Sequence, residues 1–230
     1  NTAWGGGMNY NNIIGKKLDF QSNYFYNGFN PNTESHIQRE YILPVTSYLN
    51  QNSYSDNLNN THRLNLNMLY QIDTFNSIRI TPSFSYQKTN NRSKTDYQTL
   101  SAGKSLTNEG FSNSNTLGVG YNFRNDIIWR KKFAKKGRTF SMNLQHSLNE
   151  SDGDGLQKSI NSFYQTNGSL YRTDSINQSN INSTSLRGYS ARAVYTEPLG
   201  KRFLMEFSAG KSSTKTSSAR NTYDYSSLSG

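Results

Sequence analysis

The sequence lacks cysteine, long apolar runs and most of the apolar residues that fill a soluble core. The absence of Cys among 230 residues excludes disulfides and thiolate metal sites. No segment reaches the ~18 consecutive apolar residues of a membrane helix, and the richest run, 41–45, is far shorter. Only 32% of the residues are hydrophobic and the mean hydropathy is −0.85, so a compact soluble domain would struggle to fill its core.

Residues suited to catalysis or metal binding are also scarce or scattered. The three histidines have no ligand-like spacing: His36, His62 and His146. The segment 152–155, Asp-Gly-Asp-Gly, resembles part of a calcium loop but lacks the downstream bidentate acid. The many serines would allow a Ser-His-Asp triad to be assembled from the sequence, but no spacing singles out one triad. The sequence therefore predicts no catalytic residue, no metal site and no cofactor.

The chain carries a net charge of +10, and its first residues contain neither a basic n-region nor an apolar h-region. The start is therefore expected to follow a removed signal peptide or to lie inside a longer protein. The charge admits nucleic acid, anionic lipid or an acidic ligand as a partner. Because no nucleic-acid-binding motif accompanies the charge, no nucleic acid is expected.

Aromatic residues make up 13% of the chain and recur at alternate positions. The clearest example is 186–212, where two alternating arms flank a turn with Pro198 and Gly200. The alternating apolar residues are Tyr189, Ala191, Ala193 and Tyr195, then Phe203, Met205, Phe207 and Ala209. A period of two predicts a β-hairpin. Arms of about ten residues approach the ~9–11 of a tilted strand that crosses a bilayer.

The same pattern recurs along the chain and predicts about eight strands in four hairpins. The expected strands are about 2–12, 18–28, 61–72, 77–88, 115–130, 138–149, 185–197 and 202–213. The turns inside the hairpins are expected to be short, near 14–17, 73–76, 131–137 and 198–201. Long polar loops are expected at 28–60, 89–113 and 149–183, and Pro82 predicts a local bulge. Alternation of short turns and long loops is typical of an outer-membrane barrel, so the fold expected is an all-β antiparallel transmembrane β-barrel segment.

Three stretches carry a resemblance to a known family. They are YTEPLGKR with MEFSAGKS, RKKFAKKGRTFSMNLQHSLN and GGGMNYNNIIGKKLDFQSNYFYN. The chain resembles the outer-membrane β-barrel family of TonB-dependent-receptor-like proteins of the Bacteroidetes type. The resemblance implies a plug domain and a TonB system outside this chain, a surface lipoprotein as a further partner of some members, and a barrel of about 22 strands. The chain would then be roughly a third of that barrel and end inside an extracellular loop.

By this resemblance the function is ligand capture by extracellular loops and energised import through a plugged pore, with no covalent chemistry. Related members serve secretion or surface assembly instead. Two other interpretations stay open from the residues. One is a complete eight-stranded barrel, either structural or an enzyme. The other is a soluble β-rich adhesin or glycan-binding module.

Two groups of residues are candidates for contact with lipid. The basic turn cluster is Lys16, Lys17, Arg130, Lys131, Lys132, Lys135, Lys136, Arg138, Lys201 and Arg202. These side chains either contact phosphate headgroups or only keep the turns solvated. The membrane-interface aromatics are Tyr24, Tyr26, Tyr86, Trp129, Phe133, Tyr195 and Phe203. Arg79, Arg124, Arg192 and Glu206 are expected to face the lumen.

Overall fold

The computed structural model describes residues 1–42, 44–200 and 202–225. The described chain forms one antiparallel sheet of nine strands. The strands are β1 (Thr2–Ile14), β2 (Leu18–Asn30), β3 (Asn32–Tyr41), β4 (Ser47–Gln71), β5 (Asn76–Ser101), β6 (Leu106–Lys132), β7 (Thr139–Tyr164), β8 (Leu170–Leu199) and β9 (Phe203–Asp224). The prediction of an all-β antiparallel fold is confirmed. No helix that could cross a membrane occurs in the described residues.

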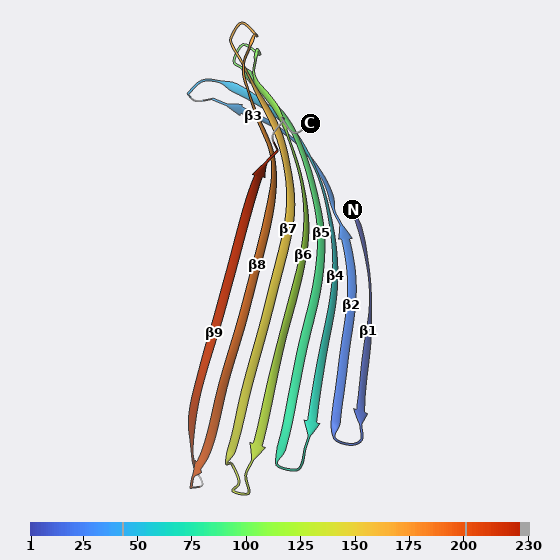
Figure 1. Ribbon diagram of the computed structural model, residues 1–230, viewed down its shortest axis with the longest axis vertical. Helices are drawn as coiled ribbons and strands as arrows, with labels where there is room; N and C mark the ends of the chain where they lie inside the picture. The colour runs from blue at the N-terminus through green and yellow to red at the C-terminus, as the bar shows by residue number, and fades with distance from the viewer. Residues whose placement is uncertain (43, 201, 226–230) are drawn as a thin grey trace.

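The strands pair in chain order, so the sheet is a meander of long hairpins (Figure 1). The order is β1-β2-β4-β5-β6-β7-β8-β9, with β3 paired to β4 only. The sheet is open, because β1 and β9 pair with β2 and β8 but not with each other. Within the described residues no hydrophobic side chain is buried, so one layer without a core forms the structure.

The extra strand, β3, continues the line of β2 along β4. β2 pairs with the second half of β4 and β3 pairs with its first half, in the same register. The two are separated by Pro31, whose carbonyl accepts a hydrogen bond from Asn57 N at 3.2 Å. Proline has no N–H to give to the ladder, which interrupts the strand without changing its course. Eight lines of backbone therefore cross the sheet.

The expected long loops are wrong, because most of their residues belong to strands. Residues 47–60 belong to β4, 88–101 to β5, 106–114 to β6, 150–164 to β7 and 170–184 to β8. β9 likewise runs on to Asp224, beyond the expected end near 213. These parts of the strands, which we call the extensions, meet at short tips near 102–105 and 165–169. Their paired backbones hydrogen-bond each other throughout, which compensates for the lack of an apolar face.

The bulge expected at Pro82 is also wrong. Pro82 pairs with Asn125 of β6 without a register shift. On the β4 side the ladder skips two pairs, between Asn65↔Ser83 and Met68↔Ile80, and resumes in the same register. The missing proline N–H thus opens the ladder locally without adding a residue to the strand. Register shifts occur instead near the tips, at Thr99/Leu100 and Phe163/Tyr164.

Candidate functional site

One face of the sheet is apolar near the short turns. Residues paired directly across strands share a face, so the register defines rows of neighbouring side chains. One such row is Ile14, Leu18, Tyr70, Ile78, Trp129, Met142, Ala193 and Ala209. Further rows of the same face include Phe20, Met68, Ile80, Ile127 and Leu144, then Leu64, Phe84, Phe123 and Leu148. Together these side chains form a continuous apolar band.

Aromatic rings bound this band on the side of the short turns. The Trp129 ring lies 5.6 Å from the Phe140 ring, centroid to centroid, in an edge-on arrangement. Phe133 approaches Tyr195 in the same way at 6.3 Å. Phe203 pairs with Leu199 at the end of the last hairpin and is 71% exposed. We call Trp129, Phe133, Phe140 and Tyr195 the turn-side belt.

A second line of aromatic rings bounds the band on the side of the extensions. Centroid distances are 4.7 Å for Tyr26–His62, 5.9 Å for His62–Tyr86 and 5.1 Å for Tyr86–Tyr121. The line continues through Phe123–His146 at 5.8 Å and His146–Tyr189 at 4.7 Å. Tyr24 Oη joins it, 2.8 Å from His62 Nδ1. We call Tyr24, Tyr26, His62, Tyr86, Tyr121, Phe123, His146 and Tyr189 the extension-side belt.

The separation of the two belts matches the thickness of a membrane. Trp129 and Tyr121 bound the band on β6 and are eight residues apart. At ~3.3 Å per residue this is roughly 26 Å along the strand. A strand tilt of ~35–45° reduces it to about 20 Å across the membrane, close to the ~25 Å apolar band of outer-membrane barrels.

The opposite face is polar at the same height and carries the residues expected to face a lumen. Arg79, Arg124, Arg192 and Glu206 all lie on this face. The Arg79 Nε–H donates to Asn67 Oδ1 at 2.9 Å. The Arg124 Nε–H donates to Asp126 Oδ2 at 3.1 Å. The sheet thus has the two-sided chemistry of a wall between lipid and water.

A comparison with known protein families decides the location of this wall. Residues 131–230 match the outer membrane protein beta-barrel family. The protein is located in the outer membrane, and its apolar band is the lipid-facing side. No curated protein matches the chain.

In this outer-membrane protein the basic turn cluster lies at one end of the sheet, where the four short turns are (Figure 1). Lys16 and Lys17 lie in the β1–β2 turn, and Arg202 lies between β8 and β9. The other described members lie at the end of β6, in the β6–β7 turn or just before β7: Arg130, Lys131, Lys132, Lys135, Lys136 and Arg138. Lys201 lies outside the described residues. Contact of these side chains with lipid phosphate stays a prediction.

An ion-pair network links two of the turns. Arg138 donates two hydrogen bonds to Glu197, from Nε to Oε2 at 2.6 Å and from an Nη to Oε1 at 2.9 Å. Lys135 Nζ donates to the same carboxylate at 2.5 Å, and the Tyr195 hydroxyl donates to it at 2.6 Å. The Arg138 guanidinium first, then Lys135 and Tyr195, holds the pKa of Glu197 well below its usual range. This network ties the β6–β7 turn to the last hairpin.

Replacing Glu197 by Gln is expected to make stability less sensitive to acid. A carboxylate whose pKa is lowered by folding stabilises the protein above its unfolded pKa of about 4.3. That contribution is lost as the pH falls from about 5 towards the lowered pKa. The urea midpoint of the wild-type protein in lipid vesicles should therefore drop more between about pH 6 and 3 than that of Glu197→Gln.

The matched control for this prediction is Glu206→Gln on the same hairpin. In the described part of the chain, Glu206 forms no ion pair within 4 Å. Its variant should follow the wild-type pH profile. Parallel profiles for the wild type and Glu197→Gln would show that the network contributes nothing to folding.

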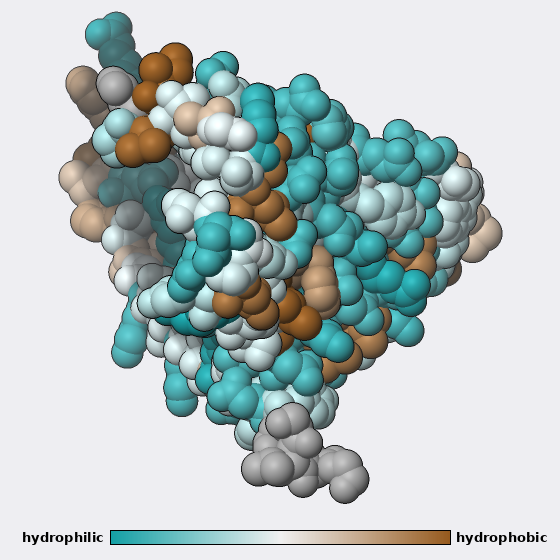
Figure 2. All heavy atoms as spheres, turned by 90° about the horizontal axis from the view of Figure 1, so that it is seen from above, coloured by the Kyte–Doolittle hydropathy of each residue, from teal (hydrophilic) through white to brown (hydrophobic). Residues whose placement is uncertain are grey.

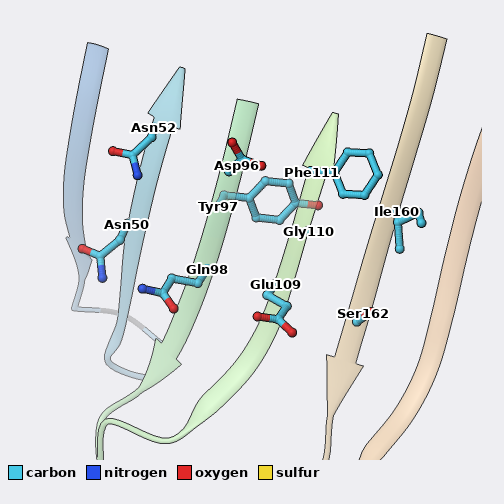
Figure 3. A pocket seen from close by; sticks show the side chains of 10 residues that line it. All are labelled: Asn50, Asn52, Asp96, Tyr97, Gln98, Glu109, Gly110, Phe111, Ile160 and Ser162. Carbon is cyan, nitrogen blue, oxygen red and sulfur yellow. The ribbon is translucent and has the colours of Figure 1, made fainter. Parts of the chain in front are cut away.

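Side chains in the extensions shape a hollow of about 420 Å³ over β4–β7 (Figure 3). Its lining is Asn50, Asn52, Asp96, Tyr97, Gln98, Glu109, Gly110, Phe111, Ile160 and Ser162. The Tyr164 hydroxyl donates to Glu109, which raises the pKa of Tyr164. Among the described residues no group of His, Cys, Asp or Glu has the arrangement of a metal site. The hollow is therefore suited to polar ligands held by hydrogen bonds.

Several belt residues were missed by sequence reasoning. The sequence predicts Tyr86 and Trp129 as interface residues because they lie near expected strand ends, but it does not single out His62, Tyr121 and Tyr189. From its residue type His62 stands out only as a potential metal ligand, yet its ring lies between Tyr26 and Tyr86. If the same number of residues is counted along each strand from its short turn, these residues fall in neighbouring rows of the sheet. The role of both belts at the membrane interface stays a prediction.

Proposed function

We propose that this chain is part of the wall of a TonB-dependent outer-membrane barrel that captures a ligand and imports it through a plugged pore. The observation that carries the proposal is the polar face. Arginines line it at the height of the apolar band, as suits a water-filled lumen: Arg63, Arg79, Arg124 and Arg192. The family resemblance of the sequence supplies the plug and the energy coupling.

The open sheet favours a large barrel over a complete eight-stranded one. β1 and β9 have free edges in the structure. Exposed edges of this length promote aggregation unless they are paired. Further strands between β9 and β1 would close the barrel and widen its lumen. The extensions, with hollows between their side chains, would then be the capture surface outside the membrane.

Conductance of the full-length parent protein in planar lipid bilayers tests the proposal. In KCl the protein should be closed, and urea that unfolds the plug should open a pore reversibly. Purified periplasmic TonB domain should bind the same preparation. A pore that is open from the start and does not bind this domain would contradict energised import. The absence of any conductance would contradict a pore.

The open pore is expected to prefer anions. On the polar face between the rows of Trp129 and Tyr121, the cations Arg63, Arg79, Arg124 and Arg192 outnumber the acids Asp19 and Asp126. Since fixed charge in a pore concentrates counter-ions, chloride should pass more readily than potassium. Replacing Arg79 and Arg192 by Gln should lower the chloride-to-potassium permeability ratio, measured by reversal potentials in a KCl gradient.

The control is Lys16→Gln with Lys17→Gln, which removes the same charge from the β1–β2 turn. This variant should keep the wild-type ratio. If it changes selectivity as much as the arginine variant does, Arg79 and Arg192 do not line the conducting path.

A further inference from the structure

A second hollow, of about 510 Å³, lies in the extensions on the face that carries the apolar band. Its main lining comes from one row of the sheet: Tyr54, Lys94, Asn113, Lys158, Asn177 and Tyr225. Tyr225 joins the row through its backbone N–H, which donates to the Asn177 carbonyl at 2.8 Å. We call this row, together with Arg92 and Asn115 of the next row, the basic groove.

The groove combines aromatic rings at its ends with cations and amides between them. Tyr54 is 41% exposed and Tyr225 56% exposed, so both rings are open to a ligand. Arg92, from the next row, adds a third cation beside Lys94 and Lys158. Aromatic faces stack on flat apolar surfaces such as those of sugar rings, and amides hydrogen-bond hydroxyl groups. The arrangement suits an acidic carbohydrate.

Two of the three cations of the groove form no ion pair within the described residues, although Asp56 of β4 lies directly opposite Arg92. Lys94 pairs with Asp96 at 3.3 Å. Over the described ranges, Arg92 and Lys158 have no carboxylate within 4 Å. Asn115 Oδ1 also lines the groove, is shielded from solvent and has no hydrogen-bond partner among the described residues. A ligand with an anionic group and hydroxyl donors would satisfy both kinds of group.

The position of the groove identifies the source of the ligand. Lys94 lies eight residues beyond Tyr86 of the extension-side belt, on the same face of β5. The distance from Tyr86 to Lys94 is roughly 26 Å along the strand. At the tilt of barrel strands, Lys94 therefore lies about 20 Å outside the apolar band. The face points away from the lumen. A ligand therefore reaches the groove sideways, from the layer of headgroups above the surrounding outer leaflet.

We propose that the basic groove binds the acidic sugar headgroup of an outer-leaflet glycolipid. Arg92 and Lys158 hold its phosphate or carboxylate, the asparagines hydrogen-bond its hydroxyls, and Tyr54 and Tyr225 stack on its sugar rings. Such a contact fixes the long extensions, which lack a core of their own, against the membrane surface. The proposal depends on the outer-membrane location and not on the import function.

Binding to the delipidated full-length parent protein tests the proposal. The probes are the phosphorylated glycolipid of the outer leaflet, the same glycolipid after enzymatic dephosphorylation, and phosphatidylglycerol, all in nanodiscs. Native mass spectrometry or surface plasmon resonance reports binding. The phosphorylated glycolipid should bind at least roughly tenfold more tightly than either of the others, because charged hydrogen bonds and sugar contacts act together.

The double variant Arg92→Gln with Lys158→Gln should lose roughly tenfold or more of that affinity. Tyr54→Ala should weaken binding of the glycolipid but leave binding of phosphatidylglycerol unchanged. The matched control, Arg172→Gln with Arg220→Gln, removes the same charge from the opposite face of the extensions and should bind as the wild type does.

Three outcomes would overturn the proposal. Equal affinity of the groove variant and the wild type would show that the groove is not the site. Equal affinity for phosphatidylglycerol would show that charge alone is recognised. Binding of the free acidic oligosaccharide released by mild acid, without binding of the intact glycolipid, would replace the membrane lipid by a soluble saccharide. None of these three outcomes would change the conductance expected for the proposed import function, so the two proposals can fail separately.

Discussion

Replacing Leu66 by Arg is expected to destabilise the folded protein in the membrane by ~2–4 kcal/mol, the cost of arginine at the lipid face of a barrel near the bilayer midplane. Leu66 lies on the apolar face of β4, midway between Tyr70 of the band and His62 of the extension-side belt. The measurement is the free energy of unfolding of the full-length protein in lipid vesicles, from urea titrations. The variant should also migrate as the unfolded form at a lower temperature on gels.

The control for Leu66→Arg is a substitution at the neighbouring residue, Asn65. Asn65 lies on the polar face, where Arg63 already occurs. Asn65→Arg is therefore expected to change the free energy of unfolding by less than ~1 kcal/mol. If both variants lose the same free energy, the lipid-facing and water-facing sides of β4 have been assigned wrongly.

The part of the fold that could be predicted from sequence is the part inside the membrane. There each strand separates lipid from water, and the two environments select alternate residues. Leu64, Leu66 and Met68 against Asn65 and Asn67 are the clearest case. All eight expected strands lie largely inside observed strands for this reason. The family match and the open antiparallel sheet agree with that assignment.

The extensions could not be predicted in this way. Outside the membrane both faces of the sheet meet water, so nothing selects alternate residues. The stretch 50–60 of β4, rich in Asn and Ser, resembles a loop in composition, although it pairs along its length with β5. Seen from above, hydrophilic residues cover most of this end of the molecule (Figure 2). Backbone pairing and cross-strand contacts sustain the strands there.

The candidate sites, like the extensions, could be predicted only in part from the sequence. Single residues such as Trp129 could be proposed from their distance to a turn, but contacts across strands depend on register. The basic groove joins residues as far apart in sequence as Tyr54 and Tyr225. A one-residue slip in the pairing of any of these strands would move the groove residues of that strand to the other face. The residues of the basic groove, and likewise those of the extension-side belt, can therefore be grouped only from the structure.

Replacing Gly110 by Val is expected to destabilise the extensions of β5–β7 by ~1–3 kcal/mol, the usual cost of overpacking. A Cβ atom at Gly110 would lie 2.4 Å from the Ile160 carbonyl oxygen and 2.7 Å from the Tyr97 hydroxyl oxygen. The Tyr97 side chain crosses β6 over this glycine (Figure 3). The tyrosine can turn away, but the Ile160 oxygen belongs to the backbone, so the β6–β7 ladder must shift.

Gly120→Val is the matched control for Gly110→Val, since both residues lie on β6 and on the same face. The nearest neighbour of a Cβ at Gly120 is the Glu150 carbonyl oxygen at 3.8 Å, an ordinary contact. Valine there should be neutral or stabilising by up to ~1 kcal/mol, because it favours strands. Amide hydrogen exchange of the full-length protein separates the two. Protection should fall at the tips of β5, β6 and β7 in Gly110→Val alone, and equal loss in both variants would show that any side chain on this face of β6 disturbs the sheet.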